Sequence, residues 1–233
     1  MKAPSLGIAS YNLQKCVGLD LRRNPGRSLD VIDATGAEVV ILQEADKRMA
    51  PRPAALPHDM IRAEGWQIAP FGQGPSLGWH GNALLLRQGI SITRCERLEL
   101  PGLEPRGAIL AELETAIGPL RVIGVHLGLV ARWRRLQCAA LRRAFEPLPR
   151  MPTLIAGDFN AWGKARDLDA ELGWVDLQVS PASFPSARPV APLDRIGISR
   201  DLSASPVEAV TTRPAQVASD HLPIRCRISR RGE

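Results

Sequence analysis

The stretch LIAGDFNAW, residues 154–162, carries the clearest structural signal in the chain. Its apolar beginning, LIA, predicts a buried strand, and ligands gather where strands of α/β proteins end. Asp158 and Asn160 follow at that point. Asp158 can accept a proton or bind a metal ion, and the Asn160 amide can donate to a phosphate oxygen that a second carboxylate would repel. The pair points to hydrolysis of a phosphate ester.

The rest of the chain alternates between strand and helix patterns, with more strands than helices. Helices are expected at residues 27–35, 131–146 and 165–172. Strands are expected at residues 5–11, 38–43, 66–69, 82–87, 90–100, 108–115, 120–127, 193–198, 203–211 and 221–228. Hairpins mixed with βαβ-like units predict an α/β protein with mixed sheets, and no linker divides residues 1–233 into more than one domain.

Composition sets limits on partners and location. Of the 233 residues, 45% are hydrophobic and 23% charged, as in ordinary globular proteins, and the net charge of +6 favours an anionic partner, either nucleic acid or an acidic membrane surface. No apolar run is long enough to cross a bilayer, and the N-terminus lacks the apolar core of a secretory signal. We therefore expect a cytoplasmic protein. Nothing in the sequence demands more than a monomer.

The helix at residues 131–146 is the most regular in the chain. Trp133, Gln137 and Leu141 fall on one side of it, together with two alanines. Four arginines fall on the other side, namely Arg132, Arg135, Arg142 and Arg143. Such a basic face is either simply solvated or binds the phosphates of a polymer or a membrane.

Chemically capable side chains recur where apolar strands end. They are Asn12, Glu44, His126, Asp158, Asn160 and the pair Asp220-His221. Each has a bland alternative: Glu44 could close a strand at the surface, His126 could be a core histidine, and Asn82, after two glycines, could be a turn residue. Their recurrence in one chain favours a shared site.

Seven segments match one known family, in that family's order. They are SYNLQ (10–14), LQEAD (42–46), GNALLLR (81–87), VHLGL (125–129), GDFNAW (157–162), PLDRI (192–196) and SDHLPI (219–224). In these the chain resembles the endonuclease/exonuclease/phosphatase superfamily, which includes exonuclease III, DNase I, inositol polyphosphate 5-phosphatases and sphingomyelinases. Its opening is similar to that of small bacterial members. The resemblance implies a four-layer sandwich of two mixed β-sheets flanked by helices, as in DNase I.

The resemblance also implies catalytic roles. Asp158 would orient or deprotonate the attacking water, and Asn160 would hold a phosphate oxygen. His221 would donate to the phosphate while Asp194 fixes its tautomer, because a buried Asp–His pair holds imidazolium at neutral pH. His126 would face the leaving group or the phosphate.

A divalent cation and substrate contacts are implied as well. Glu44 would be the principal ligand of one Mg²⁺ or Mn²⁺, and hard oxygen ligands suit such an ion. Asn12 would lie beside it and bond a metal-bound water or the phosphate. Asp220 would lie near the metal, and Asn82 is a candidate for substrate binding.

We therefore predict a divalent-metal-dependent phosphodiesterase that uses direct water attack, with DNA or RNA as the leading substrate. The alternative is a phosphodiesterase or phosphatase acting on phospholipids or small phosphorylated molecules. A non-catalytic binding module on the same fold is a third hypothesis. Gln14 stands where abasic-site repair enzymes of the superfamily carry an acid, and the only tyrosine is Tyr11 in the first strand, which disfavours that repair role.

Overall fold

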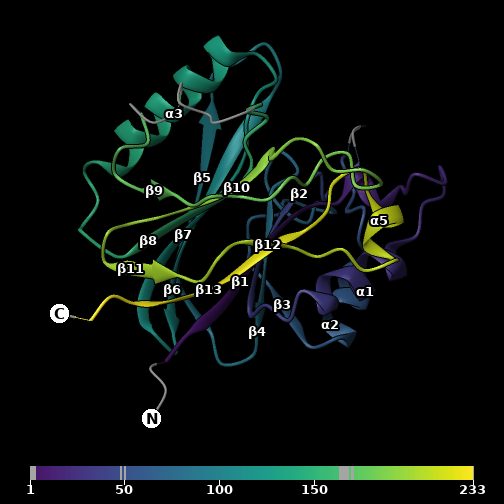
Figure 1. Cartoon of the computed structure of the whole chain (residues 1–233), viewed down its shortest axis with the longest axis horizontal. Coiled ribbons are helices and arrows are strands. Elements are labelled where there is room, and N and C mark those ends of the chain that lie inside the picture. Colours follow the sequence, from purple (N-terminus) through teal and green to yellow (C-terminus); the bar gives the residue numbers. More distant parts are fainter. Residues whose placement is uncertain (1–3, 48, 50, 163–167, 169–170, 233) are drawn as a thin grey trace.

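Two mixed β-sheets face each other in the computed structural model, which describes residues 4–47, 49, 51–162, 168 and 171–232 (Figure 1). The first sheet has the strand order β11-β13-β1-β2-β4-β3, with β12 also paired to β13. The second has the order β5-β6-β7-β8-β10-β9. Parallel pairs, β1 with β2 and β7 with β8, stand among antiparallel ones. The predicted class, α/β with mixed sheets, is confirmed.

The bounds of the elements follow. The strands are β1 (Leu6–Asn12), β2 (Val39–Gln43), β3 (Trp66–Ile68), β4 (Ala83–Arg87), β5 (Ser91–Leu100), β6 (Arg106–Thr115), β7 (Gly118–His126), β8 (Thr153–Asp158), β9 (Asp176–Leu177), β10 (Asp194–Ile198), β11 (Leu202–Ala204), β12 (Glu208–Ala209) and β13 (Ile224–Arg230). The helices are η1 (Gln14–Cys16), a 3₁₀ turn, α1 (Pro25–Ala34), α2 (His58–Ala63), α3 (Ala131–Phe145) and α5 (Ala215–Ala218).

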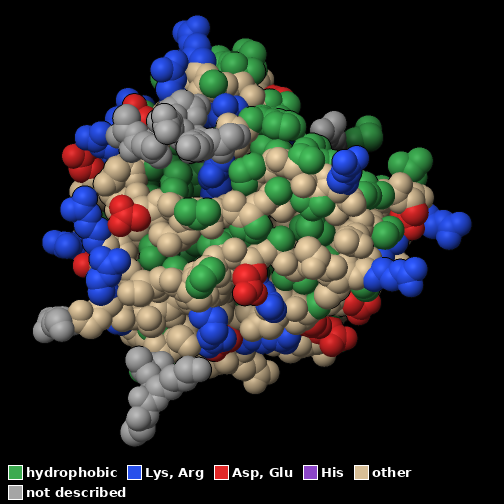
Figure 2. Space-filling view, viewed as in Figure 1, with side chains coloured by type: hydrophobic (Ala, Val, Ile, Leu, Met, Phe, Trp, Pro, Cys, Tyr) green, Lys and Arg blue, Asp and Glu red, His purple; other side chains and the backbone are tan. Residues whose placement is uncertain are grey.

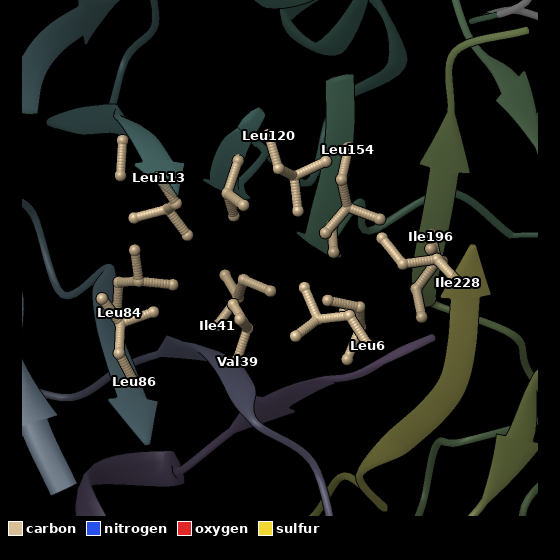
Figure 3. Close-up of a cluster of buried hydrophobic side chains, with 14 of the residues drawn as sticks. Leu6, Val39, Ile41, Leu84, Leu86, Leu113, Leu120, Leu154, Ile196 and Ile228 are labelled. Carbon is tan, nitrogen blue, oxygen red and sulfur yellow. The ribbon is translucent and has the colours of Figure 1, made fainter. Parts of the chain in front are cut away.

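Three buried clusters separate four layers. The central cluster fills the space between the sheets, where Leu6, Val39 and Ile41 of one sheet face Leu120 and Leu154 of the other (Figure 3). A second cluster joins the outer face of the first sheet to α1 and α2, and a third joins the second sheet to α3. Helix, sheet, sheet and helix therefore stack in that order, and the predicted four-layer sandwich is confirmed.

The strand period places polar side chains at one end of the central layer. Along β8, Leu154 and Ala156 belong to the central cluster, so the next residue on that face is Asp158. The same alternation leads from Leu6 and Ile8 to Asn12 on β1. The apolar side chains along β8 and β1 thus end in two polar residues, Asp158 and Asn12, which face each other between the two sheets.

Several boundaries differ from those predicted. The helix expected at 27–35 begins at Pro25, because the Asn24 side chain accepts from the Arg27 backbone N–H and caps it. No helix was predicted between the strands at 38–43 and 66–69, but this segment contains α2, and the strand predicted at 203–211 is divided into β11 and β12. The last strand begins at Ile224, so His221 lies in the turn before it. The helix predicted at 165–172 falls mostly outside the described residues.

The face of α3 toward the sheet is broader than its apolar pattern indicates. Gln137 and Leu141 are buried as predicted, but Trp133 is only partly buried, and Arg134 and Cys138 are buried beside them. Arg134 is accommodated because its guanidinium donates to the carbonyls of Gly128 and Leu129. Among the described helices, none combines the length and the apolar character that crossing a bilayer requires.

Candidate active site at the polar end of the central layer

Asp158 lies at the centre of a buried polar cluster. Its side chain is 1% exposed, and the register of the second sheet places it opposite both His126 on β7 and Asp194 on β10. Asn12, from the other sheet, donates from Nδ2 to Asp158 Oδ2 at 3.1 Å. The Asn160 backbone N–H donates to Asp158 Oδ1 at 2.9 Å. The carboxylate is therefore held in one orientation by donors from both sheets.

His221 and Asp194 form a hydrogen-bonded pair beside Asp158. His221 Nδ1 lies 2.7 Å from Asp194 Oδ2, and Ser183 Oγ donates to the same oxygen at 2.5 Å. His221 Nε2 lies 3.7 Å from Asp158 Oδ2, which is longer than a hydrogen bond. The Nε2–H is therefore available to donate to a group bound beside His221 and Asp158.

Opposing effects set the pKa values of His221 and Asp158. Burial disfavours charge on His221, but Asp194, followed by Asp158, outweighs it and raises the pKa of His221 to about 9. Burial, together with the charge of Asp194, raises the pKa of Asp158 to about 6 against the opposing effect of His221. At neutral pH, His221 is therefore an imidazolium that can donate a proton, and Asp158 is a carboxylate that can accept one.

His126 differs from His221 in charge. Burial, and then the nearby charges of Arg106 and His221, keep the pKa of His126 well below its usual value. His126 Nε2 lies 3.4 Å from Asp158 Oδ2, so this neutral imidazole also faces the central carboxylate. The site therefore holds one charged histidine, His221, and one neutral histidine, His126. The first suits a proton donor and the second a neutral hydrogen-bonding group.

Glu44 lies at the mouth of the site and is paired with a cation. Its carboxylate forms an ion pair with the Lys15 ammonium, and both side chains line a cavity of about 410 Å³. His126 and Arg106 line the same cavity, which connects Glu44 to the cluster around Asp158. The pairing of Asn12 with Gln43 in the parallel β1–β2 ladder explains why Glu44 follows at this edge.

Two site residues have left-handed backbone conformations. The φ angle is 51° at Glu44 and 49° at Asn160, a region that side-chain-bearing residues seldom occupy. Such conformations persist only where the surroundings hold them. Asn160 is held by its own side chain, because Nδ2 donates to the carbonyl of Leu127 at 2.9 Å, so that amide is engaged within the protein.

Asn82 lies between the sheets and away from the Asp158 cluster's hydrogen bonds. Its Nδ2 donates to the Gly107 carbonyl at 2.9 Å, and its Oδ1 is buried without a partner among the described residues. The side chain thus connects the start of β4 to β6. Because Asn82 Oδ1 has no partner among the described residues, substrate binding by Asn82 stays a prediction.

Asp220, Gln14 and Ser219 complete the surroundings of the predicted site. Asp220 is half-buried, and its backbone N–H donates to Gln14 Oε1 at 3.0 Å. Gln14 in turn donates from its backbone N–H to Asn12 Oδ1 at 3.0 Å. Ser219 Oγ donates to the Asn12 carbonyl and accepts from the His221 N–H.

The sequence interpretation assigned no role to Ser183, Ser219 or Lys15. Ser219 could have been found from its place directly before Asp220-His221. Ser183 lies in a Pro-rich loop with no periodic pattern, so no signal marks it as a partner of Asp194. The register of Lys15 with Glu44 depends on η1, whose three consecutive left-handed residues no simple pattern indicates.

The predicted metal ligands are not all part of one acidic cluster. Among the described residues, the close group of His, Asp and Glu side chains consists of Asp158, Asp194 and His221, whose ligand atoms lie within 4.8 Å of one another. An imidazolium cannot ligate a cation, so this group fits proton transfer better than metal binding. Glu44 offers the better fit: it is a half-exposed carboxylate in a cavity, already paired with a positive charge.

A larger cavity lies at the other end of the second sheet. It measures about 600 Å³ and is lined by Thr153 at the start of β8, Ser199 after β10, and Trp174. None of the predicted site residues lines it. Size alone therefore does not locate the chemistry, because three buried titratable groups with displaced pKa values, His126, Asp158 and His221, lie together at the opposite end.

The fold and the order of the motifs agree with known proteins. The profile of the Endonuclease/Exonuclease/phosphatase family matches residues 9–221. A mannosyl-6-phosphatase from Bacteroides thetaiotaomicron is similar in structure, with a TM-score of 0.75, 16% identity, and coverage of 96% of this chain and 99% of that one. A comparison with curated protein sequences found no match.

Two proteins named in connection with other substrates or anions share the fold. D. rerio TDP2, complexed with a single-strand DNA product, has a TM-score of 0.73 and 17% identity over 97% of this chain and 99% of that one. The human Nocturnin catalytic domain, with a bound sulfate anion, has a TM-score of 0.72 and 20% identity over 99% and 96%. The family match over most of the chain, joined to this fold, shows that the chain belongs to the endonuclease/exonuclease/phosphatase family.

Proposed function

We propose that the protein hydrolyses phosphate esters by direct attack of water, with Asp158 and His221 as the central groups. The observation that carries this proposal is the juxtaposition of a restrained carboxylate with a raised pKa and an imidazolium whose Nε2–H is not hydrogen-bonded to it. A base and a proton donor held side by side suit the attack of water on a phosphate ester.

Each residue has a part that its contacts support. Asp158 accepts a proton from water as it attacks, and Asn12 and the Asn160 N–H keep its two oxygens oriented. His221 donates to a phosphate oxygen. Asp194, through its contact with Nδ1, keeps the imidazole ring protonated and orients it. His126 remains neutral and faces the same carboxylate.

A divalent cation fits the mouth of the site. Family members generally depend on such a metal, and the Glu44 carboxylate, with the Asn12 side chain on the neighbouring strand, offers the hard oxygen donors that suit Mg²⁺ or Mn²⁺. When bound, the ion supplies neutralisation of the charge that develops on the leaving oxygen. Such an ion would replace the Lys15 ammonium as the partner of the Glu44 carboxylate.

Two substrate classes have specific support. A nuclease acting on DNA or RNA is supported by the net charge of +6 and by the similarity to TDP2, whose structure holds a single-strand DNA product. A phospholipid phosphoesterase is supported by aliphatic side chains exposed beside the site. The non-catalytic alternative has weaker support, because Asp158, His221 and Glu44 are all present.

A metal-supplemented substrate panel tests the proposal. Plasmid DNA, single-stranded DNA, RNA, bis-p-nitrophenyl phosphate and phospholipid vesicles are each incubated with Mg²⁺ or Mn²⁺, with and without EDTA. We expect hydrolysis of bis-p-nitrophenyl phosphate that EDTA abolishes. Absence of turnover on every substrate, with either metal, contradicts the proposal.

A further inference from the structure

Four exposed aliphatic side chains gather at one corner of the protein, beside the active site. Leu103 is 83% exposed, Leu129 65%, Val130 55% and Leu136 41%. They come from the loop after β5, the loop after β7 and the first turns of α3. We call these four residues the apolar rim. Figure 2 shows hydrophobic and basic side chains next to one another at the top of the molecule, where α3 lies in Figure 1.

A buried glutamine holds the two loops of the apolar rim together. Gln137 is fully buried, its Nε2 donates to the carbonyl of Pro101 at 2.9 Å, and its Oε1 accepts from the backbone N–H of Gly128 at 2.8 Å. Leu103 and Leu129 follow these two anchored points closely. Arg134 adds a third bond, to the carbonyl of Leu129 at 2.7 Å. The rim is therefore a fixed surface.

The same loops lead directly into the active site. The backbone N–H of Leu127 donates to the Asp158 carbonyl, and the Leu127 carbonyl accepts from Asn160 Nδ2. On the other loop, Glu104 and Arg106 line the cavity that contains Glu44. A surface that contacts the apolar rim would therefore lie next to the cavity mouth.

Among the described residues, basic side chains dominate the charge around the rim. Helix α3 carries five arginines and no acid, and Arg132 and Arg135 are exposed on the turns next to Val130 and Leu136. Glu104, the acid of the rim's own loop, is paired with Arg106 at 2.7 Å. Aliphatic groups framed by exposed arginines complement a surface that is apolar inside and anionic outside.

An anionic lipid surface fits this combination better than a nucleic acid does. Nucleic acid would use the arginines, but it gains its apolar contacts mainly by stacking bases on aromatic rings, and the rim's four members are aliphatic. Aliphatic side chains inserted among acyl chains lose their contact with water. A lipid surface would therefore give all four rim residues apolar contacts that a polynucleotide would not.

We propose that the apolar rim, with Arg132 and Arg135, docks the protein on an anionic membrane surface and so presents lipid headgroup phosphates to the site. The identification of the substrate rests on the proposed phosphoesterase function, whereas the docking itself does not. The rim enters the acyl boundary, the two arginines contact headgroup phosphates, and the cavity mouth beside Glu44 faces the lipid surface.

Vesicle sedimentation tests the docking. The wild type is pelleted with vesicles of phosphatidylcholine alone and with vesicles of phosphatidylcholine and phosphatidylglycerol in equal parts. The rim variant is Leu103→Ser with Leu129→Ser, and the charge variant is Arg132→Gln with Arg135→Gln. Leu21→Ser is the matched control, because Leu21 is 87% exposed in a loop near α1 and α5, across the molecule from α3 (Figure 1).

We expect the wild type and the Leu21→Ser control to bind phosphatidylglycerol vesicles equally, and the rim variant to bind them at least about tenfold more weakly. The charge variant should lose its preference for phosphatidylglycerol. Circular dichroism and the hydrolysis of bis-p-nitrophenyl phosphate should be unchanged in all variants. Wild-type protein that stays in solution with these vesicles, or a rim variant that pellets like the wild type, overturns the docking.

Two parallel measurements separate the possible failures. Binding of a single-stranded oligonucleotide is measured for the same variants, and a loss there without a loss on vesicles assigns the surface to nucleic acid and overturns the proposal. Soluble-ester hydrolysis by the wild type reports on the proposed function alone. An enzyme that hydrolyses the soluble ester but does not pellet refutes the docking only, and a protein that pellets without any esterase activity refutes the function only.

Discussion

The imidazole of His221 and the carboxylate of Asp194 lie 2.7 Å apart between Nδ1 and Oδ2, although 27 positions separate them in the chain. Asp194 begins β10 in the second sheet, whereas His221 precedes β13 of the first sheet. The pair therefore bridges the two sheets at the same end as Asn12 and Asp158, which bridge them by a second hydrogen bond. Formation of the site depends on correct packing of both sheets.

The first prediction concerns the charge of His221 in the metal-free protein. Because Asp194 and Asp158 raise the pKa of His221 to about 9 against the effect of burial, its ring should remain protonated through neutral pH, whereas His126 should remain neutral. Asp194→Asn should lower the pKa of His221, since burial then acts with less opposition, although Asp158 and Asp220 still raise it. Imidazole chemical shifts followed by NMR across the pH range measure both.

The same shift predicts a pH-dependent stability. The pKa of His221 is higher in the folded state than in the unfolded state, so its stabilising effect is complete below the unfolded value of 6.5 and disappears as the pH rises through about 9. Asp194→Asn should therefore lower the melting temperature more at pH 6 than at pH 10, by roughly 2–4 °C for each kcal/mol lost. An equal loss at both pH values would mean that the Asp194 contact is not electrostatic.

The second prediction concerns Asp158 as the base. Asp158→Asn preserves the shape of the side chain but cannot accept the proton of the attacking water, so turnover of bis-p-nitrophenyl phosphate should fall by about a hundredfold or more. Asp176→Asn, an exposed acid on β9 of the same sheet, is the matched control and should keep full activity. Full activity of a folded Asp158→Asn protein would remove Asp158 from the mechanism.

Much of this site follows from the strand period alone. On β7, β8 and β10 every second residue faces the central layer, and the sequence of those faces runs from apolar groups to His126, Asp158 and Asp194 respectively. On each of these strands, one polar residue ends the series of apolar residues on the face toward the central layer. His126 and Asp158 could therefore be predicted from their places on apolar strands, whereas Asp194 was predicted only from the family resemblance.

What the period could not provide is the geometry of the loops. His221 and Ser183 lie outside regular strands, so their meeting at Asp194 depends on turns that connect different sheets. The Lys15–Glu44 pair depends on consecutive left-handed residues in η1. The burial of Arg134 in α3 was also unexpected, because the helical pattern does not show that its guanidinium donates to the carbonyls of Gly128 and Leu129 in the loop after β7.

The third prediction concerns metal binding at Glu44. A divalent cation that takes Glu44 must displace the Lys15 ammonium, so the metal and the lysine compete for one carboxylate. Mn²⁺ should raise the melting temperature of the wild type through preferential binding to the folded state, and Glu44→Gln should abolish most of that rise. Lys15→Met should strengthen Mn²⁺ binding, measured by calorimetry, because the competing charge is gone.

The outcome that contradicts this prediction is equally specific. If Glu44→Gln retains the full Mn²⁺ stabilisation while Asp158→Asn loses it, the metal binds at the Asp158 cluster and not at the cavity mouth. Glu208→Gln is the control for loss of an acid, since Glu208 is an exposed residue of β12 paired with Arg225 at 3.3 Å. That variant should bind Mn²⁺ as the wild type does.

The fourth prediction concerns the four cysteines, which are all thiols. Burial raises the pKa of Cys16 to about 11 and of Cys226 to about 12, and Cys138 is also fully buried. Cys95 on β5 is only half-buried, although burial raises its pKa as well. Because the thiolate is the reactive species, Ellman's reagent at neutral pH should modify Cys95 slowly and the other three only after unfolding.

Denaturant provides the comparison within the same experiment. All four thiols should react in guanidinium chloride, and Cys95→Ser should leave native protein with no thiol that reacts on the timescale of Cys95. Rapid modification of Cys16 in native protein would show that η1 opens readily, because Cys16 is the buried end of that turn. Lys15 would then contact Glu44 for only part of the time. Its competition with a metal ion for the Glu44 carboxylate would be correspondingly weaker.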